Sequence, residues 1–274
     1  MALPYDGQGR AYAAAIPHGP GVPGKDMMAG VDELLDASND GIDMDVPAQV
    51  IAGETKYAGA IFHVDDLLVR LTRKDGGHVD VRRQVLRHPE CVVMLVHDVA
   101  TDHYLMERDY RAGSDMFAHG IPAGLMDDGE AVMTAAWREL REETGIVPDL
   151  DAAGRPRARV DRVGAFYSSE VMADELANVM VIHLESWHEE NRHFDPDEHV
   201  ESAWVSWEQM LGVGIQASNS VIAIQHEQLR RLGEQLRTRT SARTESSPVE
   251  SSPVESSPVE SSPVESSPVE SSIG

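Results

Sequence analysis

Three glutamates, Glu139, Glu142 and Glu143, lie within five residues of one another. In a helix, which turns by roughly 100° per residue, their side chains share one face. Like charges at this spacing repel by roughly 0.2–0.5 kcal/mol per pair, and no lysine or arginine is expected on the same arc. A divalent cation would remove this repulsion. Carboxylate oxygens suit Mg²⁺, with Mn²⁺ as a substitute, and a metal held here could neutralise a diphosphate and activate water for attack on phosphorus.

A helix over residues 131–144 is expected to position these carboxylates. The stretch contains no Gly or Pro, and Gly145 suits the position after the last turn. Asp127 and Asp128 are candidate N-caps. A neighbouring stripe of larger side chains predicts the face that packs on the core, and it consists of Met133, Trp137, Leu140 and Thr144.

The glutamates belong to a longer pattern. Residues 124–146 read GLMDDGEAVMTAAWRELREETGI and match G-x5-E-x7-R-E-U-x-E-E-x-G-U, where U is a bulky apolar residue, at every fixed position. An alternative is a solvated helix face on which Arg138 and Arg141 pair with the glutamates. That interpretation leaves Gly124, Glu130 and Gly145 unexplained.

This pattern is the Nudix box, and the chain resembles the Nudix hydrolases, which cut a diphosphate linked to a nucleoside and a further group. The resemblance implies that Glu139, Glu142 and Glu143 are metal ligands, with Glu142 and Glu143 catalytic. It implies that Arg138 orients a glutamate and that the backbone carbonyl of Ala123 adds a ligand. The fold implied is α/β, a Nudix α/β/α sandwich with a mixed sheet, preceded by a small N-terminal antiparallel sheet.

Composition indicates one sizeable core with appendages. The chain has 274 residues, of which 41% are hydrophobic, and a formal net charge of −24 at pH 7. This charge argues against nucleic acid or an anionic membrane as a general partner. The single cysteine, Cys91, lies in the apolar run CVVMLV and is expected to be a buried strand residue. There is no run of 18 apolar residues and no signal segment in MALPYDGQGR, which predicts a cytoplasmic protein.

The chain is expected to divide into four parts. These are a loosely ordered leader at 1–47 with a short helix around 31–35, a strand region at 48–88, a Nudix hydrolase domain at 89–240, and a tail at 241–274. From Glu245 the tail contains five copies of Glu-Ser-Ser-Pro-Val, and the repeated proline and low apolar content predict disorder.

Alternating apolar residues and turn signals predict the remaining elements. Asp75-Gly76-Gly77 is the expected hairpin turn of the strand region. Further strands are expected at 91–98, 103–110, 160–167, 177–185 and 202–207, with a turn near 100–102. A last helix is expected at 220–236, with an apolar face made of Val221, Ile224, Leu229, Leu232 and Leu236.

Three stretches outside the box are similar to the ADP-ribose pyrophosphatase branch of the family, and the similarity covers about residues 49–236. They are ETKYAGAIFHVDDLLVRL, VRRQVLRHPECVVMLVHD and ERDYRAGSDMFAHGIPAGLMDDGE. The resemblance implies a homodimer that exchanges the small sheet and a small nucleoside diphosphate substrate. It also implies that Arg111 contacts the phosphates or the terminal ribose, that Arg82 or Arg83 helps to bind the substrate, and that Phe62 stacks on adenine. Surface ion pairs are the alternative for the arginines.

The same branch carries an acidic residue in a later loop, as catalytic base or extra metal ligand. Candidates here are Asp195, Asp197, Glu198 and Glu201, of which Glu198 aligns best with the following strand. The nearby His188, His193 and His199 raise zinc as an alternative, but without cysteine or a regular helical spacing.

One loop departs from the branch. Residues 168–175 read SSEVMADE, where relatives often have Gly at the place of Val171.

The box and the resemblance to this branch predict metal-dependent hydrolysis of ADP-ribose, or a related ADP-sugar, to AMP and a sugar phosphate. The alternatives are another nucleoside diphosphate derivative (a different nucleotide sugar, a dinucleoside polyphosphate or an oxidised nucleoside triphosphate) or a non-catalytic nucleotide-sugar sensor.

Overall fold

The computed structural model describes residues 25–38, 41–193 and 199–245. The chain up to Arg230 forms one compact unit, and residues from Arg231 onward form a second. Among the helices of the described part, none combines the length and apolarity needed to cross a membrane. The predicted tail repeats lie outside the described residues, apart from Glu245.

The N-terminal region contains a helix and a three-stranded antiparallel meander, β1-β2-β3. The bounds are α1 Lys25–Asp36, β1 Gln49–Ala58, β2 His63–Thr72 and β3 His78–Arg87. Gly76 has φ +83°, and the Asp75 carboxylate accepts the Gly77 amide at 2.8 Å, so the predicted hairpin turn is confirmed. The leader helix is longer than expected.

A mixed seven-stranded sheet forms the centre of the first unit. Its strands are β4 Cys91–Asp98, β5 His103–Arg111, β6 Met116–Gly120, β7 Ala123–Leu125, β9 Ala158–Tyr167, β10 Leu176–Leu184 and β12 Glu201–Ser206. The order is β12-β5-β4-β10-β9, with β6 on β5 and β7 on β4. Strands β4 and β10 are parallel and the other pairs antiparallel. β8 Ile146–Pro148 and β11 Trp187–Glu189 form a separate antiparallel pair.

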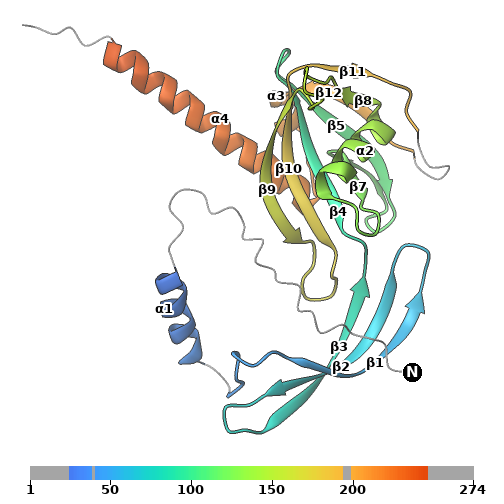
Figure 1. Ribbon diagram of the computed structural model, residues 1–274, viewed down its shortest axis with the longest axis vertical. Helices are drawn as coiled ribbons and strands as arrows, with labels where there is room; N and C mark the ends of the chain where they lie inside the picture. Colours follow the sequence, from blue (N-terminus) through green and yellow to red (C-terminus); the bar gives the residue numbers. More distant parts are fainter. Residues whose placement is uncertain (1–24, 39–40, 194–198, 246–274) are drawn as a thin grey trace, which may run out of the picture. The chain divides into compact units, whose positions relative to one another are not determined.

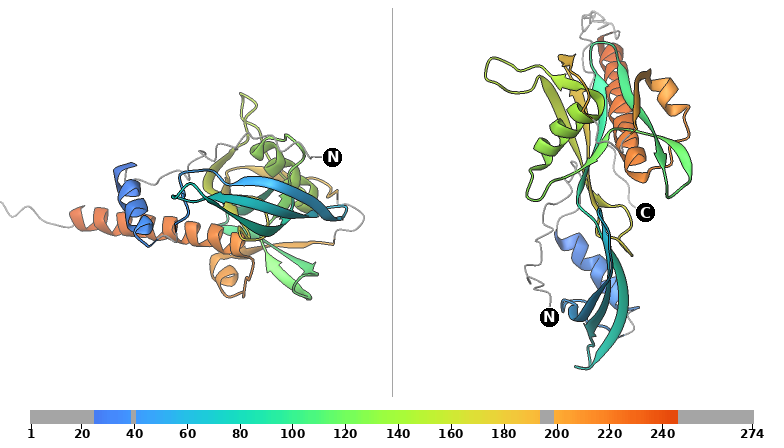
Figure 2. Two further views of the ribbon diagram at one scale, coloured as in Figure 1. Left: turned by 90° about the horizontal axis from the view of Figure 1, so that it is seen from below. Right: turned by 90° about the vertical axis from the view of Figure 1, so that its right-hand side faces the viewer.

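Helices cover both faces of this sheet, as Figure 1 and the right-hand view of Figure 2 show. They are α2 Val132–Thr144 on one face and, on the other, α3 Trp207–Leu211 and the first part of α4 Ser218–Glu245, which contributes Ala223 and Ile224 to the core. Strand β4 is buried throughout because its side chains alternate between two cores: Val93 and Leu95 pack with α3 and α4, and Val92 and Met94 pack with α2. The expected α/β/α sandwich with a mixed sheet is confirmed.

The start of the box helix differs from the prediction. The N-cap is Ala131, with no side-chain cap, so neither Asp127 nor Asp128 has that role. The reason is that residues 127–130 form a turn of their own, in which the Glu130 carboxylate accepts the Asp127 amide at 3.1 Å. The core-facing stripe is supported by Leu140 and Thr144, which are buried.

The predicted apolar face of the last helix is wrong over its second half. Leu229, Leu232 and Leu236 are exposed. The buried stripe follows Ser220, Ala223, Ile224 and Glu227 instead. A periodicity search discards Glu227 as polar, but the Tyr104 hydroxyl and the Arg230 guanidinium satisfy its carboxylate inside the core.

Four short strands and α3 were not predicted. β6, β7, β8 and β11 have three to five residues each, too few to show a clear alternation. Trp207, the expected end of a strand, begins α3 instead, because Ser206 and Gln209 form a capping box at the start of this helix. Cys91 is buried, as expected, and burial raises the pKa of its thiol to about 12.

Candidate active site

Both ends of the box depend on a glycine with a steric role. A Cβ added to Gly124, on β7, would lie 2.0 Å from Cδ of Glu139. The missing side chain therefore lets the Glu139 carboxyl lie directly on the β7 backbone, next to Ala123. At the other end Gly145 has φ +73°, and an added Cβ would lie 2.4 Å from the carbonyl oxygen of Glu190.

The segment after β11 is tied to the end of the box helix. The Glu190 amide donates to the Gly145 carbonyl at 2.7 Å, and the His193 amide donates to the Glu142 carbonyl at 3.0 Å. Arg141 and Glu190 form an ion pair at 2.7 Å. The acidic loop that follows His193 thus starts beside the box.

Arg138 is the centre of the box's hydrogen bonds. Its guanidinium donates to three carboxylates, those of Glu130 at 2.8 Å, Glu139 at 2.8 Å and Glu142 at 3.1 Å. The hydrogen bond to Glu130 is the main reason why the pKa of Arg138 is raised. The expectation that no basic residue reaches the carboxylate arc is therefore wrong: a long guanidinium spans from its own position to both i+1 and i+4.

The three box glutamates differ in burial. The side chain of Glu139 is 12% exposed and that of Glu142 is 42% exposed, whereas Glu143 is 7% exposed. Their carboxyl groups do not converge as the ligands of one metal ion do, because the Arg138 guanidinium binds those of Glu139 and Glu142. Within the described ranges, the grouping of three metal-ligating side chains with ligand atoms within 4.8 Å of one another lies elsewhere, at His97, His183 and Glu227.

Glu107, on β5, is a polar residue that the sequence analysis missed. It is buried, and its Oε1 has no hydrogen-bond partner in the described part of the chain. Burial raises its pKa to about 8, although the charges of Arg111 and Arg192 oppose the shift. The available signal was its place two residues after Leu105, which packs on the α2 side of the sheet.

These carboxyl groups fit a hard cation. Glu107 faces the α2 side, and the negative charge of Glu139 acts on it directly. A buried carboxyl oxygen without a donor is costly, and a cation among these oxygens would satisfy it. The donor set is all oxygen, which favours Mg²⁺ or Mn²⁺ over softer metals.

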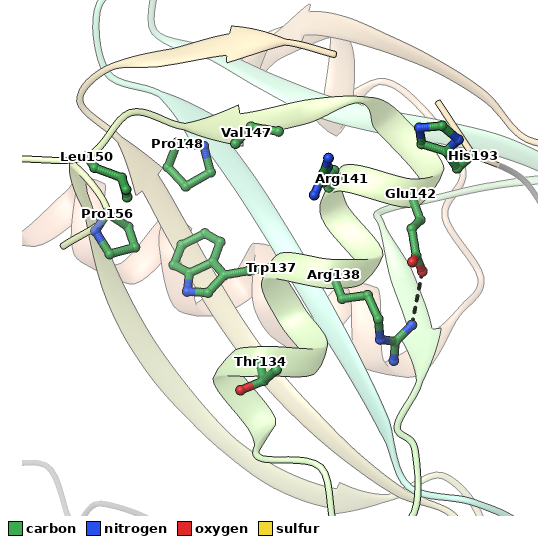
Figure 3. A pocket seen from close by; sticks show the side chains of 10 residues that line it. All are labelled: Thr134, Trp137, Arg138, Arg141, Glu142, Val147, Pro148, Leu150, Pro156 and His193. Atoms are coloured by element: carbon green, nitrogen blue, oxygen red, sulfur yellow. Dashed lines mark hydrogen bonds and ion pairs between the residues drawn. The ribbon is translucent and has the colours of Figure 1, made fainter. Parts of the chain in front are cut away.

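A hollow of about 680 Å³ borders the exposed side of the box helix. Figure 3 shows Arg138 and Glu142 at one end, Leu150 and Pro156 at the other, and Trp137 between them. Its remaining lining residues are Thr134, Arg141, Val147, Pro148 and His193. The size suits a small organic ligand, and one wall offers an aromatic ring beside charged groups.

The predicted substrate-binding residues outside the box are dispersed. Arg111 is exposed at the end of β5 and pairs with Asp109 at 3.3 Å. In the N-terminal sheet Arg82 forms an ion pair with Asp66, Arg83 donates to the carbonyl of Arg82 at 2.9 Å, and the ring of Phe62 lies 5.6 Å from that of Tyr57. The contacts of Arg82, Arg83 and Phe62 stay within the N-terminal region, so the structure does not bring these three residues to the box. Arg111 differs, because its charge acts on Glu107.

The acidic loop is only partly described. Glu198, with Asp195 and Asp197, lies outside the described residues. Glu201 pairs with Arg108, with its Oε2 2.9 Å from Nε. The zinc alternative receives no support: His188 binds Asp149 at 2.8 Å, and no metal-competent grouping within the described chain includes His188, His193 or His199.

The loop that departs from the branch holds the end of β3. The Leu86 amide donates to the Met172 carbonyl at 2.8 Å, and the Asp174 amide donates to the Leu86 carbonyl at 3.1 Å. The Asp174 carboxylate also accepts the amide of His88 and pairs with Arg87. Residues 168–175 therefore fasten the segment that links the small sheet to the sandwich, and Val171 is left exposed.

Comparison with known proteins agrees with this arrangement. The NUDIX domain family matches residues 87–223. An ADP-ribose pyrophosphatase of Bacillus subtilis (strain 168) is 30% identical over 188 residues, which are 66% of this chain and 93% of the relative. A methanol dehydrogenase activator of Bacillus methanolicus is 28% identical over 153 residues, 54% of this chain and 77% of the relative.

A solved structure of an ADP compounds hydrolase has the same fold. Its TM-score is 0.54 at 20% sequence identity, and the match covers 69% of this chain and 96% of that one. The family match spans half of the chain and contains the complete box. The chain therefore belongs to the Nudix family and is a pyrophosphohydrolase of the branch that resembles the ADP-ribose pyrophosphatases.

Proposed function

We propose that this enzyme hydrolyses the diphosphate of ADP-ribose, or of a closely related ADP-sugar, to AMP and a sugar phosphate. The observation that carries the substrate class is the match to the Bacillus subtilis ADP-ribose pyrophosphatase along almost the whole of that protein. The hollow beside Arg138 and Glu142 has room for a nucleoside next to the box.

In this proposal Glu139, Glu142 and Glu143 hold Mg²⁺, for which Mn²⁺ can substitute, and the carbonyl of Ala123 adds a ligand. The metal, when bound, would neutralise charge on the diphosphate and make water more acidic. Gly124 gives Glu139 room against β7, and Arg138 keeps Glu139 and Glu142 oriented.

The remaining site residues have supporting roles in the proposal. Arg111 attracts the phosphates from the end of β5. Glu198 acts as the base, supported by the anchoring of its loop at Glu190 and His193 on the box helix. Phe62 and either Arg82 or Arg83 contact the substrate of a partner subunit. Within their own chain these side chains contact residues of the N-terminal region and not the box. The enzyme is then a homodimer.

A second candidate is a different nucleoside diphosphate derivative. The loop at 168–175 favours this candidate, because its hydrogen bonds to Leu86 and His88 hold the end of β3. A panel of nucleotide substrates separates the two, with phosphate release coupled to alkaline phosphatase for the nucleotide sugars and to inorganic pyrophosphatase for 8-oxo-dGTP, whose terminal phosphate alkaline phosphatase would remove directly. We expect ADP-ribose to be turned over at least about tenfold more efficiently than 8-oxo-dGTP, a difference of about 1.4 kcal/mol. The reverse preference would overturn ADP-ribose as the substrate.

The catalytic part of the proposal is tested by Glu142→Gln and Glu143→Gln. Each change keeps the size of the side chain and removes a charge, so the fold should survive while kcat/KM falls by about 10²–10⁴ at saturating Mg²⁺. Glu185→Gln, at an exposed position after β10, is the matched control and should be fully active. If either box variant keeps more than about a tenth of wild-type activity, that glutamate is not an essential ligand, since a tenfold loss is only about 1.4 kcal/mol.

A further inference from the structure

A buried polar cluster lies inside the sheet, apart from the Nudix box. His97 on β4 and His183 on β10 are 7% and 3% exposed, and Glu227 on α4 is fully buried. One nitrogen of each imidazole and one oxygen of Glu227 lie within 4.8 Å of one another. None of these residues has a part in the proposed diphosphate chemistry.

The two imidazoles are linked in a chain that ends in a carboxylate on each side. His97 Nε2 lies 2.9 Å from Oδ1 of Asp102, and His183 Nε2 lies 3.2 Å from Oδ2 of Asp161. Between the rings, the two Nδ1 atoms are 2.9 Å apart. All three separations are hydrogen-bond distances.

This chain of hydrogen bonds has one proton fewer than it has contacts. Each of the three contacts needs one proton, because carboxylates accept only and a bare imidazole nitrogen also accepts. Two neutral imidazoles carry only two protons. If both Nε2 atoms donate to their carboxylates, two lone pairs face each other across the 2.9 Å between the Nδ1 atoms of His97 and His183. A third proton or a metal ion between the rings would satisfy all three contacts at once.

The surroundings favour the metal. A shared proton needs only the two rings, whereas a third metal-ligating group also converges on them: one oxygen of Glu227 lies within 4.8 Å of one nitrogen of each imidazole. Histidines that bind a metal through one nitrogen usually donate the other N–H to a carboxylate, as His97 and His183 can do here.

We propose that His97, His183 and Glu227 form a second, transition-metal site, for which Zn²⁺ is the best-fitting ion. Two imidazoles and one carboxylate are a known zinc ligand set, with water able to take the fourth position. Metal–nitrogen bonds of about 2.0–2.1 Å in a tetrahedral arrangement need the nitrogens about 3.3 Å apart, so the rings must separate by only a few tenths of an ångström.

The oxygens of Glu227 are already oriented for this role. The Tyr104 hydroxyl donates to Oε1 at 2.5 Å, and Arg230 donates to both oxygens at 2.6 Å. The ring of Tyr104 also stacks on that of His97, with centroids 4.6 Å apart. A metal bound here would join the first turns of α4 to β4 and β10, so its role is to fix α4 on the sheet.

Metal content of the full chain tests the proposal. The protein is stripped with a chelator, equilibrated with Zn²⁺ in excess Mg²⁺ and dialysed before elemental analysis. Mg²⁺ competes for all-oxygen sites such as the box and poorly for imidazole, so retained zinc reports the new site. We expect about one Zn²⁺ per chain for the wild type, and Co²⁺ in its place should give the strong visible absorption of a tetrahedral site.

Variants then locate the bound ion. His97→Gln and His183→Gln should lose the zinc. The control His103→Gln should keep it, since the His103 ring hydrogen-bonds with the carbonyl of Thr101 and belongs to no metal-ligating group among the described residues. Zinc should raise the melting temperature of the wild type and of His103→Gln but not of the other two. Wild-type protein that retains no Zn²⁺ or Co²⁺ overturns the proposal and leaves a shared proton between the rings. Zinc binding by His97→Gln and His183→Gln that equals zinc binding by the wild type also overturns it. The wild-type measurement stands even if a variant fails to fold.

Discussion

Replacing Gly124 with alanine tests whether Glu139 acts from its position on β7. The added Cβ would lie 2.0 Å from Glu139 Cδ, whereas ordinary contacts begin at 3.4 Å. The Glu139 carboxyl must therefore move by about 1.4 Å, which is the difference between these two distances. A misplacement of about 1 Å in a catalytic constellation can reduce the rate by about 10². We expect a loss of this order in kcat/KM for ADP-ribose at saturating Mg²⁺.

Stability should change little in the same variant. The φ of Gly124 is not in the left-handed region, so alanine restricts the unfolded chain and contributes about 0.4–1 kcal/mol of stability. Against this, a displaced Glu139 rotamer costs about 0.5–1.5 kcal/mol, and weakening its ion pair with Arg138 costs up to about 1 kcal/mol. The losses exceed the gain by about 1 kcal/mol, so the melting temperature should fall by no more than a few degrees.

Two controls make the result specific. Gly214→Ala adds a methyl group where no described atom outside the neighbouring residues lies within 4 Å; it should leave activity unchanged and raise the melting temperature slightly, since alanine contributes about 0.4–1 kcal/mol at a compatible position. In a Glu139→Gln background, Gly124→Ala should add little further loss, because both changes act through the same side chain. The reasoning is refuted if Gly124→Ala keeps more than about a third of wild-type kcat/KM, or if its two effects add in full with those of Glu139→Gln.

The other predictions concern the hollow, Arg138, assembly and the tail. Trp137→Leu keeps an apolar side chain against the core and should raise KM more than it lowers kcat; an unchanged KM would remove the hollow from substrate binding. Arg138→Gln should lower the melting temperature more in EDTA than in Mg²⁺, since a metal can replace the lost cation; equal shifts would argue against a metal at the box. Light scattering should give twice 30.0 kDa, and removing residues 1–88 should abolish folding or activity; an active monomeric remainder would exclude the dimer. Removal of residues 245–274 should leave turnover and melting temperature nearly unchanged, because the Glu-Ser-Ser-Pro-Val repeat has too little apolar composition to form a core.

Features encoded by local spacing could be predicted from the sequence. The box helix follows from an uninterrupted run that ends at Gly145, and the turn of the small sheet follows from Asp75-Gly76-Gly77. β4 and β10 are continuous apolar runs, as a strand with helices on both faces requires. The order of the strands could not be predicted in this way, because pairing between distant segments leaves no local pattern; resemblance implied only the α/β/α sandwich with a mixed sheet.

The errors came from side chains whose partners are distant in the sequence. Glu227 interrupts an apolar stripe and looks solvent-facing, yet Tyr104, more than a hundred residues away, provides its hydrogen bond in the core. His97 and His183 look like ordinary strand residues until the parallel pairing of β4 with β10 sets them opposite each other. Glu107 likewise becomes notable only once α2 covers its face of the sheet.

Arg138 changes how the two interpretations of the box helix relate to each other. A solvated face with paired charges and a metal-binding face were posed as alternatives, and the Arg138 contacts with Glu139 and Glu142 at first favour the former. Paired charges do not, however, explain why Gly124 leaves room for the Glu139 carboxyl, nor why Glu107 is buried with an unsatisfied oxygen. Both interpretations hold if Arg138 supplies the positive charge while no metal is bound. The guanidinium then keeps like-charged side chains together, and the site stays folded between metal-binding events at a modest cost in metal affinity.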